Sequence, residues 1–217
     1  MKELAREKGI FVTFEGADGS GKTSVSQGVY QSLVTAGYQV VYTREPGGSE
    51  IAEQIRNVIL DLENVAMDYK TEALLYAASR RQHLVDIIWP ALSNGKIVIC
   101  DRFVDSSLAY QGFARGIAID DILEINKFAI EDFFPDLTIF LEVTAEAGLA
   151  RIKNRTNLDR LDQESSDFHK KVVTGYQEIL KMFPERFLVF DGMKTIDELV
   201  TEITSGIIEW IDKDVSK

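Results

Sequence analysis

Short apolar runs alternate along the chain with longer segments of helical periodicity. The apolar runs are rich in Val, Ile and Phe, and they predict buried strands over Phe11 to Phe14, Gln39 to Tyr42, Ile97 to Cys100, Leu137 to Val143 and Phe187 to Phe190. The segments between and after them predict helices over Lys22 to Ala36, Ile51 to Leu62, Thr71 to Leu92, Asp120 to Phe133, Asp167 to Met182 and Asp197 to Trp210. This alternation predicts an α/β fold in which helices cover both faces of a five-stranded parallel sheet. In such sheets, ligands bind at the carboxyl ends of the strands.

The length and composition indicate one globular domain. The chain has 217 residues, of which 45% are hydrophobic and 27% charged, and no linker divides it. Lys and Arg number 24 against 35 Asp and Glu, so the net charge is −11. An acidic surface repels nucleic acid and anionic membranes, so we expect neither as a partner.

The N-terminus and the cysteine content favour a cytoplasmic location. Residues 1–8 lack the apolar core of a secretion signal, and the chain has no run of about 18 apolar residues. The single cysteine, Cys100, excludes a disulfide within the chain, and with His83 and His169 it makes a poor set of zinc ligands.

The strongest motif follows the first predicted strand. Gly16, Ala17, Asp18, Gly19, Ser20, Gly21, Lys22 and Thr23 match the phosphate-binding loop pattern that ends in Gly-Lys-Thr. Because the match lies between a predicted strand and a predicted helix, backbone N–H groups and the positive end of the helix dipole would surround a phosphate. Lys22 would contact the β and γ phosphates of ATP, and Thr23 would offer its hydroxyl to Mg²⁺. The alternative interpretation is a glycine-rich turn with an exposed lysine.

A phosphate-binding loop does not by itself define a function. Switch GTPases need a guanine-reading Asn-Lys-x-Asp motif, whereas residues 126–129 read Asn-Lys-Phe-Ala. ATP-driven partition proteins usually carry an additional early lysine in the loop, where this chain has Ala17 and Asp18. A small-molecule phosphotransferase is therefore the leading hypothesis.

A second pair of charged residues follows the strand predicted over Ile97 to Cys100. Asp101 and Arg102 come directly after this strand, so they should emerge at the same edge of the sheet as the loop. Asp101 is placed to hold a metal ion directly or through water, and Arg102 is placed to grip a substrate phosphate with its planar guanidinium. A surface Asp-Arg pair is the alternative.

The helix predicted from Thr71 carries two adjacent arginines. Its apolar stripe consists of Leu74, Ala78, Val85, Ile88 and Leu92, and Arg81 falls within this stripe. We therefore expect Arg81 to need a carboxylate or phosphate partner, because an unpaired buried charge is costly. Tyr76 and Arg80 are four residues apart on a neighbouring face, an arrangement that suits a stacked and hydrogen-bonded base. The alternative is a core tyrosine and a solvated arginine.

The segment from Arg151 to Ser166 is polar and lacks a regular apolar period. It carries Arg151, Arg155 and Arg160, which predicts a lid that closes on the donor, expels water and stabilises charge in the transition state. The alternative is an exposed basic turn balanced by Asp159, Asp162 and Glu164.

Three motifs lie between Ile10 and Trp210. They are Phe14-Glu15-Gly16-x-Asp18-Gly19-x-Gly21-Lys22-Thr23, then Thr43-Arg44-Glu45-Pro46-Gly47-Gly48, and then Asp101-Arg102-Phe103 followed by Ser106-Ser107-x-Ala109-Tyr110-Gln111-Gly112. Together they resemble the bacterial thymidylate kinases, whereas adenylate kinases have a Gly-Pro-Gly-type loop that this chain lacks. The resemblance implies a P-loop NTPase-type three-layer fold and a single nucleoside-monophosphate-kinase-like domain over residues 1–217, with a lid at about 151–166. It also implies transfer of the γ-phosphoryl group of ATP to dTMP, giving dTDP and ADP in dTTP biosynthesis, by a homodimer.

The resemblance further implies a dTMP site. Its expected members are Asp18, Arg44, Glu45, Arg56, Tyr76, Arg80, Arg102, Ser107, Tyr110 and Gln111. Arg44 and Arg102 would contact the acceptor phosphate, with Arg56 completing the clamp. Tyr76 would stack on the base at a position where many relatives have Phe.

The base and the sugar would be recognised by other members of this set. Arg80 and Gln111 would hydrogen-bond thymine. Asp18 would bind the 3′-hydroxyl of the sugar, and Tyr110 would crowd a ribose 2′-hydroxyl and so favour deoxyribose.

Catalysis is expected from Lys22, Arg102 and an arginine of the lid, with Mg²⁺ at Thr23 and Asp101. Positions 17, 18 and 20 are not basic, so the chain resembles the members that carry the catalytic arginine in the lid. Of the three lid arginines, Arg155 and Arg160 are favoured over Arg151 because they lie within the irregular stretch.

Two rival functions stay open at this point. One is another pyrimidine nucleotide or nucleoside kinase, which an assay with several acceptors would separate from a dTMP kinase. The other is an ATP-dependent conformational switch with a protein partner, which would turn over ATP slowly whatever monophosphate is present.

Overall fold

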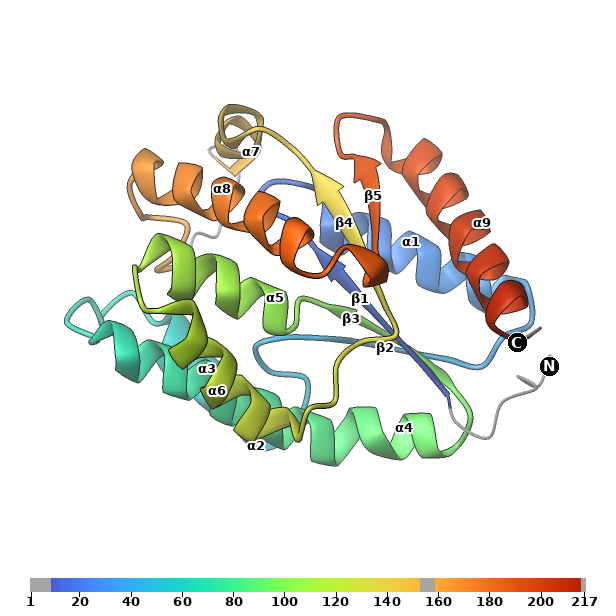
Figure 1. Ribbon diagram of the computed structural model, residues 1–217, viewed down its shortest axis with the longest axis horizontal. Coiled ribbons are helices and arrows are strands. Elements are labelled where there is room, and N and C mark those ends of the chain that lie inside the picture. Colours follow the sequence, from blue (N-terminus) through green and yellow to red (C-terminus); the bar gives the residue numbers. More distant parts are fainter. Residues whose placement is uncertain (1–8, 153–158, 216–217) are drawn as a thin grey trace.

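The structure is a computed structural model that describes residues 9–152 and 159–215. Its strands are β1 (Ile10–Glu15), β2 (Val40–Arg44), β3 (Ile97–Asp101), β4 (Leu137–Glu142) and β5 (Phe187–Asp191). All neighbouring strands pair in parallel, in the order β2-β3-β1-β4-β5. The predicted five-stranded parallel sheet is therefore confirmed (Figure 1).

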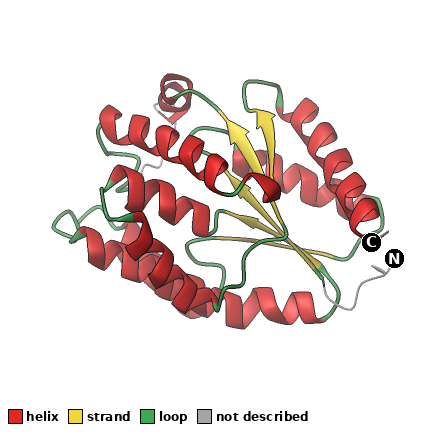
Figure 2. Ribbon diagram, in the orientation of Figure 1, coloured by secondary structure: helices red, strands yellow, loops and turns green. Residues whose placement is uncertain are grey.

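Helices fill the connections between the strands (Figure 2). They are α1 (Lys22–Thr35), α2 (Glu50–Leu60), α3 (Tyr69–His83), η1 (Leu84–Ile88), α4 (Trp89–Ser93), α5 (Val104–Ser107), η2 (Leu108–Ala114), α6 (Ile119–Ile130), α7 (Ala145–Ile152), α8 (Ser166–Met182), η3 (Pro184–Arg186) and α9 (Ile196–Val215). The helix predicted over Thr71 to Leu92 is observed as α3, the π-helical η1 and α4 in succession. The helical segment formed by α5 and η2 was not predicted.

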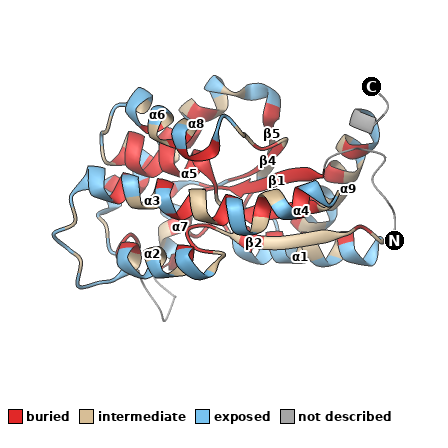
Figure 3. Cartoon of the chain, turned by 90° about the horizontal axis from the view of Figure 1, so that it is seen from below, coloured by how far each residue is buried: buried red, intermediate tan, exposed pale blue. Residues whose placement is uncertain are grey.

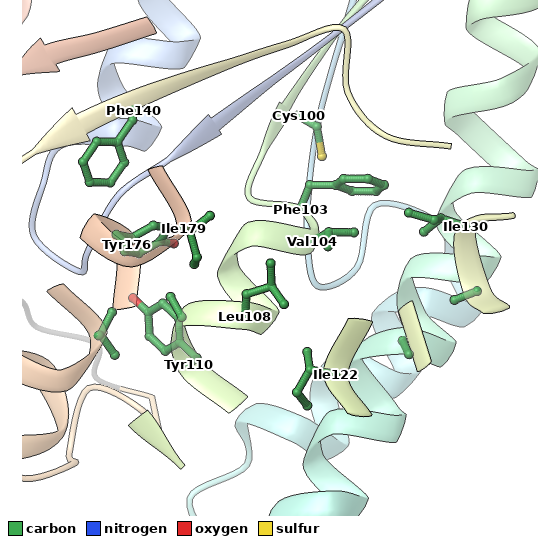
Figure 4. Close-up of a cluster of buried hydrophobic side chains, with 14 of the residues drawn as sticks. Cys100, Phe103, Val104, Leu108, Tyr110, Ile122, Ile130, Phe140, Tyr176 and Ile179 are labelled. Atoms are coloured by element: carbon green, nitrogen blue, oxygen red, sulfur yellow. The ribbon is translucent and has the colours of Figure 1, made fainter. Parts of the chain in front are cut away.

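Two hydrophobic cores lie on opposite faces of the sheet. On one face α1 packs against α9. Apolar residues of these helices, such as Val25 in α1 and Ile203 in α9, form a core with alternate residues of the strands, such as Val12 in β1. On the other face the core combines apolar residues of α3 to α6 and α8; Figure 4 shows part of it around Phe103 and Leu108. These two cores confirm the three-layer arrangement.

The central strand β1 places the phosphate-binding loop at the middle of one sheet edge. Every residue of β1 is buried, which accounts for its nearly continuous run of apolar positions (Figure 3). In the ladder Phe14 pairs with Asp101, and Asp101 in turn pairs with Arg44. The three sequence motifs therefore meet at neighbouring strand ends. Within the described residues no helix combines the length and apolarity needed to cross a bilayer.

Candidate functional site

A cavity of about 260 Å³ opens at this edge of the sheet. Its lining includes every residue expected at the dTMP site: Asp18, Arg44, Glu45, Arg56, Tyr76, Arg80, Arg102, Ser107, Tyr110 and Gln111. Lys22, Thr23 and Asp101 also line it, so the structure brings the loop, the expected metal ligands and the expected acceptor site into one cavity.

The phosphate-binding loop has the backbone that its glycines allow. Gly19 has a φ of 78°, and a Cβ atom there would collide with the carbonyl oxygen of Gly148 in α7. Gly21 precedes α1 with a φ of 88°, so α1 begins at Lys22 with its N-terminus at the loop. The Lys22 side chain is buried, and burial together with the nearby charge of Arg102 lowers its pKa to about 8.

Thr23 and Asp101 form the candidate metal site. The Thr23 hydroxyl donates to Asp101 Oδ2 at 2.5 Å. The other carboxylate oxygen, Oδ1, is buried without a hydrogen-bond partner among the described residues. A carboxylate oxygen left free beside a hydroxyl is a donor set that suits a hard cation such as Mg²⁺.

Arg102 joins the end of β3 to the phosphate-binding loop. Its guanidinium pairs with the carboxylate of Asp18, donates to the hydroxyl of Tyr110 at 3.1 Å and to that of Tyr176 at 3.4 Å. Burial alone would raise the pKa of Asp18, but Arg102 and Lys22 outweigh it and lower the pKa to about 2. Asp18 is therefore ionised at neutral pH, and the structure rejects the surface-pair interpretation of Arg102.

Arg80 is the buried arginine of α3. Only 1% of its surface is exposed. Its Nε donates to Glu45 at 2.7 Å, and its other nitrogens donate to Ser107, to Asn126 and to the carbonyl oxygen of Phe103. These partners hold the guanidinium rigidly at the cavity wall.

Glu45 is held in turn by a buried histidine. His83 Nδ1 lies 3.1 Å from Glu45 Oε1, and His83 Nε2 lies 2.6 Å from the hydroxyl of Thr43. The last turn of α3 and the end of β2 therefore fix the partner of Arg80 together.

The prediction for Arg81 is half right: it has the expected carboxylate partner, but it is not buried in an apolar stripe. Its side chain is 40% exposed and pairs with Glu131 at 2.8 Å, while Leu74 and Val85 of the predicted apolar stripe are exposed. The physical reason is that the buried face of α3 carries small and polar residues beside the cavity, among them Ala77 and Arg80.

The arginines of the expected phosphate clamp are anchored by groups that the sequence did not reveal. Arg44 pairs with Glu53 of α2 at 3.0 Å, and both Arg44 and Arg56 donate to the carbonyl oxygen of Pro46. Glu53 also accepts the backbone N–H of Gly48. Glu53 therefore ties the Arg-Glu-Pro-Gly-Gly run to α2.

Glu15 is a second functional residue that sequence reasoning missed, although its place directly before the loop was a signal. Its carboxylate accepts from the backbone N–H of Phe103, from the hydroxyl of Ser106 and from the hydroxyl of Tyr176, at 2.7 to 2.8 Å. Burial, with a smaller contribution from the Asp105 carboxylate, raises its pKa to about 7. Glu15 thereby fixes the chain that follows Arg102.

The lid arginines lie in different places. Arg151 donates to the carbonyl oxygens of Gly19 and Gly192 at 3.1 Å, so it lies on the phosphate-binding loop. Arg160 is buried and donates to Ile59 and Glu72, so the structure does not support favouring it over Arg151. Its burial requires a carboxylate partner, and Glu72 supplies it. Arg155 lies outside the described residues.

Comparisons with known proteins agree with this geometry. Residues 14–203 match the sequence model of the family described as thymidylate kinase. The chain is 52% identical to a thymidylate kinase of Bacillus velezensis over 207 residues, which cover 94% of this chain and 98% of that protein. It is 51% identical to a thymidylate kinase of Clostridium novyi over 198 residues, covering 90% and 97% respectively.

A solved structure supports the same assignment. The crystal structure of thymidylate kinase from Ehrlichia chaffeensis superimposes with a TM-score of 0.72 at 35% sequence identity. The match covers 91% of this chain and 97% of that one. The family model and these relatives match the chain over nearly its full length, and the chain has the phosphate-binding loop and the clustered arginines described above. The chain therefore belongs to the thymidylate kinase family.

Proposed function

We propose that this chain transfers the γ-phosphoryl group of ATP to dTMP, giving ADP and dTDP on the route to dTTP. The observation that carries the proposal is the cavity at the carboxyl edge of the sheet, which joins the phosphate-binding loop to Arg44, Arg80 and Arg102. A cavity with these arginines beside the loop suits an acceptor phosphate held next to the phosphates of ATP. The thymidylate kinases that resemble the chain over 90% or more of its length identify the pair.

ATP binds through the loop and the start of α1. The backbone N–H groups of the loop and the N-terminus of α1 bind the phosphates, and Lys22 neutralises the β and γ oxygens. Arg151 lies against the loop at Gly19, where a guanidinium is placed to meet charge that develops on the transferred group.

The acceptor phosphate binds in the same cavity, against arginines that lie beside the loop. Arg102 and Arg44 offer planar guanidinium groups that match phosphate oxygens. The acceptor oxygen is already ionised at neutral pH, so the chain needs to align it with the γ phosphorus rather than deprotonate it. Tyr76 and Arg80 face the base from α3, and Asp18 with Tyr110 faces the sugar.

Thr23 and Asp101 would hold Mg²⁺, because Asp101 Oδ1 has no partner among the described residues. Held there, Mg²⁺ would supply positive charge that offsets the negative charge of the ATP phosphates. Asp101 also keeps the Thr23 hydroxyl oriented at the start of α1.

The chain is further proposed to act as a cytoplasmic homodimer. Large apolar side chains are exposed on α2, α3, η1 and α6, where Ile51, Val58, Leu74, Val85 and Phe128 are 51%, 47%, 56%, 43% and 89% exposed. Helix α3 packs against both α2 and α6, so these side chains lie on neighbouring helices. A second copy would cover them. Sedimentation of the protein tests this, and a monomer at micromolar concentration would refute it.

A coupled assay of ADP release tests the proposed reaction. The purified chain is supplied with ATP, Mg²⁺ and one acceptor at a time: dTMP, dUMP, dCMP or thymidine. We expect the highest kcat/KM with dTMP. A higher value with thymidine would indicate a nucleoside kinase, and slow ATP turnover unaffected by any acceptor would indicate a conformational switch.

A further inference from the structure

Glu72 is a buried carboxylate in the first turn of α3 that no part of the proposed reaction uses. None of its surface is exposed. It accepts from Gln111 Nε2 at 2.9 Å, from Arg115 Nε and Nη2 at 3.2 and 3.1 Å, and from Arg160 Nη2 at 2.5 Å. Three side chains therefore converge on one carboxylate.

The ionised carboxylate determines which way the Gln111 amide points. Burial acts to raise the pKa of Glu72, but hydrogen bonds from Arg115 and Gln111 outweigh burial and lower it. An ionised carboxylate only accepts hydrogen bonds, so Gln111 must turn its NH₂ group to Glu72. The amide oxygen, Oε1, is then the atom of Gln111 that is left to face the cavity that Gln111 lines.

Arg80 lines the same cavity and can only donate hydrogen bonds. A fixed donor beside a fixed acceptor fits a base edge that presents an acceptor beside a donor. Thymine and uracil present O4 and N3–H in this order. Cytosine presents an amino group and an unprotonated N3, so donor would meet donor and acceptor would meet acceptor.

We propose that Glu72 is a positioning residue that makes the site specific for thymine-type bases by locking the orientation of the Gln111 amide. The inference rests on the proposed function, since it concerns the base of the same acceptor. Glu72 would act on the base only through Gln111, without touching the substrate itself.

The same carboxylate ties base recognition to the segment that follows α7. Arg115 binds Glu72 with one side of its guanidinium, and its Nη1 binds Glu164 at 2.6 Å. Arg160 binds Glu72 and the carbonyl oxygen of Ile59. Residues 160 to 164 are therefore anchored to the group that orients Gln111, and displacement of this segment would loosen the amide.

The variant Glu72→Gln tests the proposal, because it keeps the shape of the side chain and removes the charge. The new amide can donate as well as accept, so Gln111 is free to turn over. We expect the preference for dTMP over dCMP, as a ratio of kcat/KM values, to fall by about tenfold or more. The ratio of dTMP to dUMP should stay constant, since both bases present the same edge, and the KM for ATP should not change.

Asp105→Asn is the matched control. Asp105 on α5 is equally buried, pairs with Arg186 at 2.5 Å and is not among the residues that line the cavity. This variant should lose stability in urea unfolding but keep the preference of the parent for dTMP over dCMP. A purely structural role of Glu72 would give both variants the same profile.

Two outcomes would overturn the inference. The first is an unchanged ratio of dTMP to dCMP in folded Glu72→Gln. The second applies if that variant does not fold. The double variant Glu72→Gln/Arg115→Met removes the charge of Glu72 together with that of one of its two arginine partners. In this double variant the ratio should fall equally, and an unchanged ratio would refute the proposal. If the parent protein does not phosphorylate dTMP at all, the proposed function fails, and this is seen before any variant is made.

Discussion

Arg102 forms an ion pair with Asp18 while its own backbone is left-handed, with a φ of 72°. The conformation turns the chain sharply after β3, so that the guanidinium points back to the phosphate-binding loop. Glu15 holds the turn by accepting the N–H of Phe103. The side chain and the backbone of one residue thus perform separate tasks, and substitutions can separate them.

Arg102→Ala and Arg102→Gly both remove the guanidinium, so both should raise the KM for dTMP strongly. They differ in backbone, because a left-handed conformation costs a residue with a Cβ atom about 1 kcal/mol more than glycine. We therefore expect Arg102→Gly to be more stable than Arg102→Ala by about 1 kcal/mol in urea unfolding. An unchanged KM for dTMP in both variants would show that Arg102 is only structural.

The three lid arginines should respond differently to truncation. Arg151→Met should lower kcat by up to ~10³-fold with a small effect on the KM for dTMP, because Arg151 lies on the loop that holds ATP. Arg160→Met should instead raise the KM for dTMP, since Arg160 binds Glu72. Arg155→Met tests the expectation drawn from the sequence.

Steady-state kinetics with both substrates varied separates these effects. A large loss of kcat in Arg160→Met with an unchanged KM for dTMP would contradict the assignment made from the structure. It would mean that Arg160 leaves Glu72 and reaches the phosphates during turnover.

The sequence predicted the sheet well because its central strands are buried on both faces. A strand such as β1, buried at every position, produces a short and nearly continuous apolar run, and the glycine-rich segment that follows it excludes a longer helix. The phosphate-binding loop was equally clear, since its glycines and its lysine occupy fixed positions in the chain.

The buried face of α3 could not be predicted in the same way. Apolar periodicity selected Leu74 and Val85, but this helix buries Arg80 and His83 because their partners, among them Glu45, come from distant segments. In addition, the π-helical η1 shifts the phase of the helix, so one wheel of 3.6 residues per turn does not describe both sides of it: Leu74 is exposed, whereas Ile88 and Leu92 are buried. A buried polar face gives no periodic signal.

Glu15 should make stability depend on pH in a defined window. Its pKa is about 7 in the folded chain against an ordinary value of 4.5, so between these values the folded state binds more protons than the unfolded state. The contribution of Glu15 to stability is therefore complete below pH 4.5 and is lost as the pH rises through 7. Asp18 has the opposite shift, but it titrates below this window.

The variant Glu15→Gln removes this titration and keeps an oxygen acceptor for Phe103. We expect the free energy of unfolding of the parent, relative to the variant, to fall between pH 5 and pH 7.5 by an amount on the order of a few kcal/mol at most. Urea unfolding at several pH values measures it. A constant difference across the window would show that Glu15 titrates as an ordinary carboxylic acid.

Lys22 should make ATP binding depend on pH in the alkaline range. Its pKa of about 8 in the nucleotide-free chain reflects burial and the charge of Arg102, opposed by Asp18, Asp101 and Glu15. The phosphates of ATP bring negative charge to the ammonium group and favour its protonated form, so binding near pH 8 should take up protons. The dissociation constant for ATP should therefore increase as the pH rises from 7 to 9. Calorimetry in buffers of different ionisation enthalpy would measure both effects.

The variant Lys22→Met is the control. It should bind ATP more weakly and lose the proton uptake, and uptake retained in this variant would assign the titration to another group.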